Sequence, residues 1–199
     1  MIDRAGFLRL GVATVVGGAI VPSAASAGLP NPVPVGDDEG FLQFGALAER
    51  VSLVYYRRAV KLRGVWSGTE RTALQAAARQ KVTHVQQLTA ALGADAPSSD
   101  DYSVVLPDSA FRTRAGTLSL GARLERLLVG VYVSGAGFTA DSASRLLLSR
   151  LLANDAQHLA ALCALDRQPM VGGLPEPVDL AAAGDLLDQL LKANGYPTT

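Results

Sequence analysis

The chain has 199 residues, of which 49% are hydrophobic and 18% charged, and its basic and acidic residues cancel to a formal net charge of zero. This length predicts a single domain with a sizeable apolar core. A neutral chain without a basic stripe argues against nucleic acid as a partner and gives no reason to expect an anionic membrane surface.

Residues 1–27 have the pattern of an export signal peptide. Arg4 and Arg9 flank a short charged region, an apolar run follows, and Ala25-Ser26-Ala27 offers a cleavage site. The apolar run is short and rich in Gly and Ala, so we expect cleavage and no stable membrane span afterwards. A retained N-terminal anchor is the alternative.

The export route has two candidates. Residues 3–9, with the sequence DRAGFLR, resemble a twin-arginine signal in which Ala5 replaces one arginine of the pair. Sec export remains the other route. Either route predicts a protein of the periplasm, the cell envelope or the extracellular space.

The first predicted helix follows a proline-containing linker over residues 28–40 and runs from Phe41 to about Leu62. Its apolar residues recur every three or four positions, which is the helical period. The shared face contains Leu42, Ala46, Glu49, Leu53, Tyr56 and Val60. The apolar neighbours of Glu49 therefore direct its carboxylate inward.

The second predicted helix opens at Ser67-Gly-Thr-Glu70, which has capping-box spacing, and stops at Gly93. Its inner stripe contains Leu74, Ala77, Lys81, His84, Val85, Leu88 and Leu92. Lys81 thus lies in the middle of an otherwise apolar face. The chain has only three lysines, so we do not interpret this one as an ordinary surface residue.

Residues 93–116 contain prolines and no helical period, which predicts a long connection. A third helix is predicted from about Thr117 to Gly135, broken by Gly135-Ala-Gly137. Its inner face contains Leu118, Ala122, Glu125, Val129 and Tyr132.

A fourth helix is predicted from about Asp141 to Leu165, with Asp155 and His158 in register on its apolar face. The single Cys163 cannot form an internal disulfide, and its apolar surroundings predict a buried thiol. Residues 167–199 are predicted to form a loop and a short helix, Leu180 to Lys192, which Asn194-Gly195 ends. The pattern predicts an all-α protein: an antiparallel four-helix bundle over residues 41–166, with a long crossover between its second and third helices.

The two halves of the bundle repeat. Adding 76 takes Glu49 to Glu125 and Tyr56 to Tyr132, and adding 74 takes Lys81 to Asp155 and His84 to His158. These are the only two histidines of the chain. Inward Glu and His side chains repeated over four helices are typical of a carboxylate-bridged two-metal site.

These residues resemble the ferritin-like superfamily, in particular the exported bacterial ferritin-like domain proteins, over residues 41–165. The resemblance implies Glu on the first and third helices and Glu-x-x-His on the second and fourth, around a di-iron or related site. Glu49, His84, Glu125 and His158 match this pattern. Asp155 stands where the fourth helix should carry its bridging glutamate, and Lys81 stands where the second helix should carry a glutamate.

Two interpretations follow. In the first, the di-iron site is degenerate: Lys81 replaces a metal ion and bridges carboxylates, Tyr56 and Tyr132 support it, and the protein is a non-catalytic structural or binding protein of the cell envelope. In the second, His158, Asp155, Glu125 and Glu49 bind one iron or manganese ion beside the Lys81 cation, for metal handling or oxidoreductase activity, and His84 is a further candidate ligand. An enzyme with two metal ions is a third possibility. In each case the resemblance implies a monomer or small oligomer and not a cage.

Overall fold

The computed structural model describes residues 38–97, 104–169 and 173–192. The predicted signal peptide, residues 28–37 of the predicted linker and the helix stop at Asn194-Gly195 lie outside the described residues. The described segments contain helices and no strand. Among these segments, no helix combines the length and the apolar character that crossing a membrane requires.

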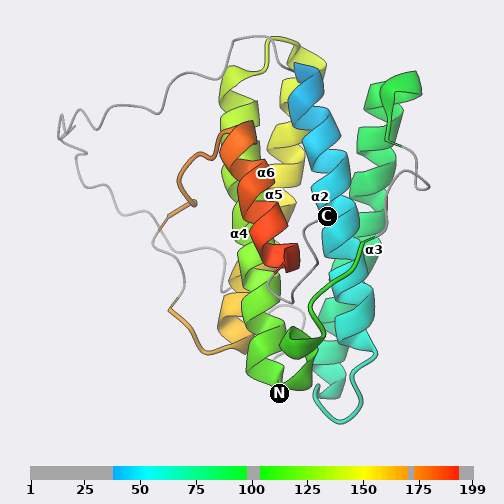
Figure 1. Ribbon diagram of the computed structural model, residues 1–199, viewed down its shortest axis with the longest axis vertical. Coiled ribbons are helices and arrows are strands. Elements are labelled where there is room, and N and C mark those ends of the chain that lie inside the picture. Colours follow the sequence, from blue (N-terminus) through cyan, green and yellow to red (C-terminus); the bar gives the residue numbers. More distant parts are fainter. Residues whose placement is uncertain (1–37, 98–103, 170–172, 193–199) are drawn as a thin grey trace, which may run out of the picture. The chain divides into compact units, whose positions relative to one another are not determined.

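Four long helices form the bundle (Figure 1). They are α2 (Asp38–Val60), α3 (Gly68–Leu92), α4 (Arg114–Phe138) and α5 (Ser142–Leu165). Helix α2 packs against α3 and α4, and α5 packs against α4 and α3, so the four helices close a ring around a common core. This arrangement confirms the predicted all-α bundle.

Contacts at the helix ends fix the directions of the helices. The Tyr55 hydroxyl, near the end of α2, donates a hydrogen bond to the Thr117 carbonyl, near the start of α4 (3.0 Å). At the opposite end, the Asp38 carboxylate accepts hydrogen bonds from the backbone N–H groups of Ala140 (2.8 Å) and Asp141 (2.7 Å). Helices α2 and α4 are therefore antiparallel.

The connections agree with the predicted topology. Ser67 caps α3 with both bonds of the capping box, as its spacing predicts. The long connection between α3 and α4 contains two short 3₁₀ helices, η1 (Gly93–Asp95) and η2 (Asp108–Arg112), among its described residues. Phe111 of η2 is buried, and the Arg58 guanidinium lies 4.1 Å from the centroid of its ring.

The predicted bounds of two helices were wrong. Helix α2 begins at Asp38, inside the predicted linker, because Asp38 and Glu39 place negative charge at the helix N-terminus and Asp38 binds the α4–α5 turn. Helix α4 begins at Arg114 and continues through Gly135 to Phe138. Gly135 does not break the helix: a Cβ atom there would lie 2.8 Å from Leu148, so close packing against α5 explains this glycine.

The buried face of α2 is broader than predicted. Leu53, predicted to face inward, is only half-buried, whereas Val51, Ser52 and Tyr55 are buried. Ser52 and Tyr55 are covered by α4, where they hydrogen-bond to Glu125 and Thr117, and α2 also contacts a further helix, α6 (Leu180–Lys192). More of its circumference is therefore covered than a single apolar stripe suggests.

Helix α6 packs against α4 and α2 through its buried residues Ala183, Leu187 and Leu190. The segment before it is fixed to α4 by a hydrogen bond from the Val178 N–H to the Gly130 carbonyl (3.1 Å). A Cβ atom at Gly130 would lie 2.7 Å from Val178, so the glycine allows this close approach.

Candidate functional site

Six polar side chains meet in the core at the middle of the bundle, and every bundle helix contributes at least one. They are Glu49 from α2, Lys81 and His84 from α3, Glu125 from α4, and Asp155 and His158 from α5. The three carboxylates and Lys81 are completely buried, and the histidines are 2% (His84) and 7% (His158) exposed. We refer to these six residues as the buried cluster. The structure therefore brings together every site residue that the sequence predicts.

The Lys81 ammonium occupies the centre of the buried cluster. Its Nζ lies 2.9 Å from Glu49 Oε2, 3.0 Å from Glu125 Oε2 and 2.7 Å from Asp155 Oδ1. Burial would lower the pKa of Lys81, but the three surrounding carboxylates outweigh burial and raise that pKa above its ordinary value. Lys81 is therefore a charged ammonium that ties α3 to the other three helices of the bundle.

The carboxylates differ in their surroundings. Burial would raise the pKa of Glu49, yet Lys81 and His84 together hold it below its ordinary value. Burial and the nearby charge of Glu49 raise the pKa of Asp155, in spite of Lys81. Glu125 accepts a hydrogen bond from the Ser52 hydroxyl (3.1 Å). The surroundings thus shift the pKa values of Glu49 and Asp155 in opposite directions.

The two tyrosines of the repeat lie at the cluster but bind differently. The Tyr132 hydroxyl donates a hydrogen bond to Glu49 Oε1 (3.0 Å). The Tyr56 hydroxyl is buried near Glu125 without a hydrogen bond of normal geometry. Burial first, and then the adjacent carboxylates, raise the pKa values of both phenols well above 10. Tyr132 thus supports the cluster through a hydrogen bond, whereas Tyr56 packs edge-on against the His158 ring, with 5.8 Å between the ring centroids.

The histidines present their ring nitrogens to the carboxylates. His84 Nδ1 lies 3.1 Å from Glu49 Oε1, and its Nε2 is buried without a hydrogen-bond partner. His158 Nε2 lies 2.6 Å from Gln80 Oε1, an acceptor, so this nitrogen donates. His158 Nδ1 then faces inward, 3.3 Å from Asp155 Oδ1, and forms no hydrogen bond.

Sequence reasoning missed Gln80 and Ser52. Gln80 is exposed and precedes Lys81, so its helical position alone suggests a solvated side chain. Ser52 lies one turn after Glu49, but the predicted inner face passes through Leu53 and therefore omits Ser52. The sequence contains one clue to Ser52: it is a small polar residue three positions after a buried carboxylate, and therefore on the same side of the helix.

The charges of the buried cluster do not balance with Lys81 alone. Three ionised carboxylates and one ammonium leave a net charge of −2 if both imidazoles are neutral. Uncompensated charge is costly in a protein interior. Two protons within the buried cluster, or a bound cation, would neutralise the remainder.

The donor set does not fit two metal ions. A complete site of this type has four carboxylates and two imidazoles, whereas the buried cluster has three carboxylates, all in contact with an ammonium. Two overlapping trios do have ligand atoms within 4.8 Å of one another: Glu49, His84 and Asp155, and Glu125, Asp155 and His158. The second trio includes two buried atoms without hydrogen bonds, His158 Nδ1 and Asp155 Oδ2, so it fits one metal ion better than two.

Comparison with known proteins gives one match. The model of a protein family described as a ferritin-like domain matches residues 37–167. This range begins one residue before α2, ends just after α5 and contains the whole buried cluster. No curated protein and no solved structure matches the chain.

Proposed function

Because the chain belongs to the ferritin-like domain family, we propose that it is an exported member whose di-iron site is degenerate, and that it serves as a non-catalytic structural or binding protein of the cell envelope. One observation carries the proposal: the Lys81 ammonium lies within 3.0 Å of all three carboxylates that would otherwise hold metal. A positive charge in this place offsets part of the carboxylate charge and repels a cation.

Two features of the buried cluster support a structural role. Lys81 pairs with carboxylates from three different helices, and removal of one partner from a buried charge pair is strongly destabilising. Ser52 and Tyr132 add hydrogen bonds to the carboxylates, which buried charges require. The side chains that would serve catalysis in a complete site are thus engaged in holding the helices together.

The export part of the proposal rests on residues 1–27, with their charged start, apolar run and Ala25-Ser26-Ala27 cleavage site. The intact mass of the exported protein tests it. Cleavage after Ala27 gives a chain that begins at Gly28, whereas a retained anchor gives the full mass.

A second candidate function is the binding of one metal ion by Glu125, Asp155 and His158. The inward His158 Nδ1 and the unpartnered Asp155 Oδ2 favour it, because each is a potential metal ligand whose lone pair accepts no hydrogen bond. The Gln80 contact at Nε2 leaves Nδ1 with the lone pair that a metal needs. A bound iron or manganese ion would supply Lewis-acid or redox chemistry, with Lys81 as a neighbouring cation.

Elemental mass spectrometry distinguishes the two functions. Residues 28–199 are expressed with iron, manganese and zinc available, beside a Lys81→Glu variant. We expect no stoichiometric metal in the unmutated protein and two metal ions per chain in the variant, which regains the fourth carboxylate. About one metal ion per chain in the unmutated protein would contradict the structural proposal and support the single-ion site.

A further inference from the structure

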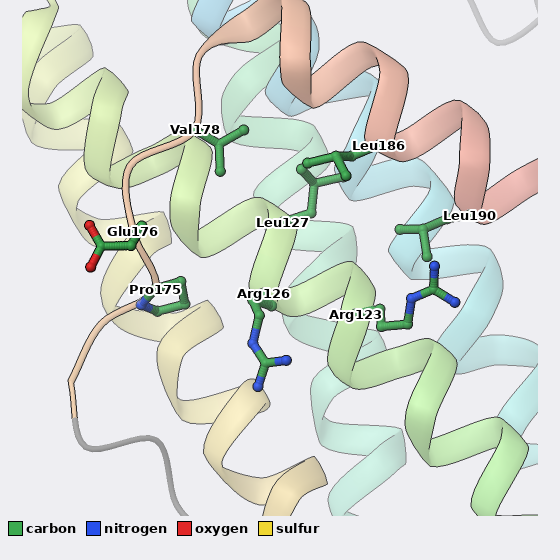
Figure 2. A pocket seen from close by; sticks show the side chains of 8 residues that line it. All are labelled: Arg123, Arg126, Leu127, Pro175, Glu176, Val178, Leu186 and Leu190. Atoms are coloured by element: carbon green, nitrogen blue, oxygen red, sulfur yellow. The ribbon is translucent and has the colours of Figure 1, made fainter. Parts of the chain in front are cut away.

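A groove of about 420 Å³ lies between α4 and the C-terminal segment (Figure 2). It is separate from the buried cluster: Arg123 and Arg126 line it from the exposed side of α4, whereas Glu125 between them points into the core. Its volume falls within the ~300–1,000 Å³ typical of small-molecule sites. The groove therefore has room for a ligand of modest size.

The floor of the groove is apolar. Leu127 of α4 and Leu190 of α6 are almost completely buried, and Val178 and Pro175 form the wall beside them. Leu186 completes the lining and remains 42% exposed. Leu186 therefore leaves part of the apolar lining open to solvent.

The same area gathers exposed apolar side chains. Four large hydrophobic residues of the described segments are exposed, and two of them belong here: Leu186 lines the groove, and Leu174 directly precedes Pro175 in its wall. Exposed leucines in isolation need no explanation, but two at one groove indicate apolar surface that a ligand can cover.

The rim of the groove is positively charged. Arg123 and Arg126 lie one turn apart on α4, and within the described part of the chain neither guanidinium forms an ion pair. The one acidic residue of the lining, Glu176, directs its carboxylate away from both guanidinium groups in Figure 2. An anion at the rim would therefore find two guanidinium groups that no described carboxylate already binds.

From this combination we propose that the groove binds an anionic amphiphile, a molecule with a carboxylate or phosphate head and an alkyl chain. The guanidinium of Arg123 or Arg126 binds the head, because guanidinium matches carboxylate and phosphate in bidentate hydrogen bonds. Leu127, Leu186 and Leu190 cover the alkyl chain. The proposal involves no metal and does not depend on the state of the buried cluster.

The wall of the groove depends on the docking of the C-terminal segment. The Val178 N–H binds the Gly130 carbonyl, and a Cβ atom at Gly130 would lie 2.9 Å from the Glu176 carbonyl oxygen. A larger residue at this position must displace the segment. Gly130→Val therefore tests the groove without changing any residue that contacts the ligand.

Calorimetric titration of the full chain with butanoate, octanoate and decanoate is the test, with 1-octanol as the uncharged probe. Affinity should rise about two- to fourfold for each added methylene, because each buried methylene is worth up to ~0.8 kcal/mol. Arg123→Gln/Arg126→Gln should weaken octanoate binding at least tenfold. Arg57→Gln/Arg79→Gln, which makes the same charge change at exposed positions of α2 and α3, should leave binding unchanged.

A second arm identifies the source of the ligand. Vesicles of phosphatidylglycerol replace the free carboxylates, and co-sedimentation is measured for the same variants. The proposal is supported if either probe binds and if both Arg123→Gln/Arg126→Gln and Gly130→Val weaken that binding. The probe that binds then identifies the head group. Absence of binding to both probes, equal affinity for octanoate and 1-octanol, or binding that neither variant changes would overturn it.

Discussion

Replacement of Lys81 by methionine tests the central contact of the molecule. Methionine has a similar length and fills the same space without charge, so the change removes the ammonium and leaves little cavity. Glu49, Glu125 and Asp155 would then lie together in the core without their shared cation. The expected loss is thus electrostatic in origin.

The size of the loss follows from the burial of the partners. Breaking a buried ion pair by removal of one partner costs about 3–5 kcal/mol. A domain of this size has a total stability of roughly 5–15 kcal/mol, so a large part of it would disappear. The melting temperature should fall by roughly 6–20 °C, taking ~2–4 °C per kcal/mol. Because Lys81 contacts three carboxylates, we expect a fall in melting temperature in the upper half of this range.

Urea denaturation followed by circular dichroism measures this loss, with Lys61→Met as the matched control. Lys61 is exposed at the end of α2, so the same replacement there should change the stability by no more than about 0.5 kcal/mol. Acid supplies an internal check. At about pH 4 the orphaned carboxylates can take up protons, so the difference between the Lys81→Met variant and the unmutated protein should narrow.

Two results would refute the reasoning. If Lys81→Met is as stable as the unmutated protein at neutral pH, the ammonium does not hold the bundle together. If the variant is destabilised equally at neutral pH and at about pH 4, lost packing and not lost charge explains the effect. Recovery of stability on addition of manganese or zinc would show that the freed carboxylates bind metal.

Further predictions concern the tyrosines and one glycine. The pKa values of Tyr56 and Tyr132 are raised in the folded protein, so the unfolded chain loses these protons at lower pH than the folded protein does. The free energy of unfolding should therefore fall above about pH 10, by up to ~1.4 kcal/mol per pH unit for each group. Urea midpoints at pH 8 and 11 measure this fall, and Tyr132→Phe should reduce it; an unchanged slope would count against buried, protonated phenols. Gly121→Ala should destabilise by about 1–3 kcal/mol, because the added methyl would overlap the Tyr55 ring and hydroxyl. Gly137→Ala is the control: with open space around it, alanine should stabilise α4 by up to ~1 kcal/mol, and thermal denaturation of both variants decides whether packing or helix propensity dominates.

The sequence predicted the buried cluster because its residues interrupt apolar helical stripes. Glu49, Lys81 and Asp155 each lie among leucines and alanines at the helical period, so their inward direction follows from their neighbours. The contacts of Lys81 with all three carboxylates could be anticipated from charge alone, since a buried ammonium requires partners.

Other features depend on tertiary contacts that a single helix does not encode. Gly135 was predicted to break α4, but its role is to admit Leu148 of the neighbouring helix. The groove could not be predicted either, since it exists only where the segment around Val178 docks on Gly130. In both cases the feature depends on a contact between two segments that are distant in the chain. The hydrophobic periodicity of either segment alone does not reveal that contact.

The contacts of Lys81 also have a consequence for the alignment of the helices. Sliding α5 by one residue along its axis would move Asp155 by about 1.5 Å and turn it by about 100° away from the Lys81 ammonium. Leucine and alanine surfaces tolerate such slippage, because one apolar contact replaces another at little cost. A 2.7 Å ion pair does not tolerate it. We therefore expect that Lys81 fixes the register of the four helices along their axes, among the several registers that their apolar faces alone would allow.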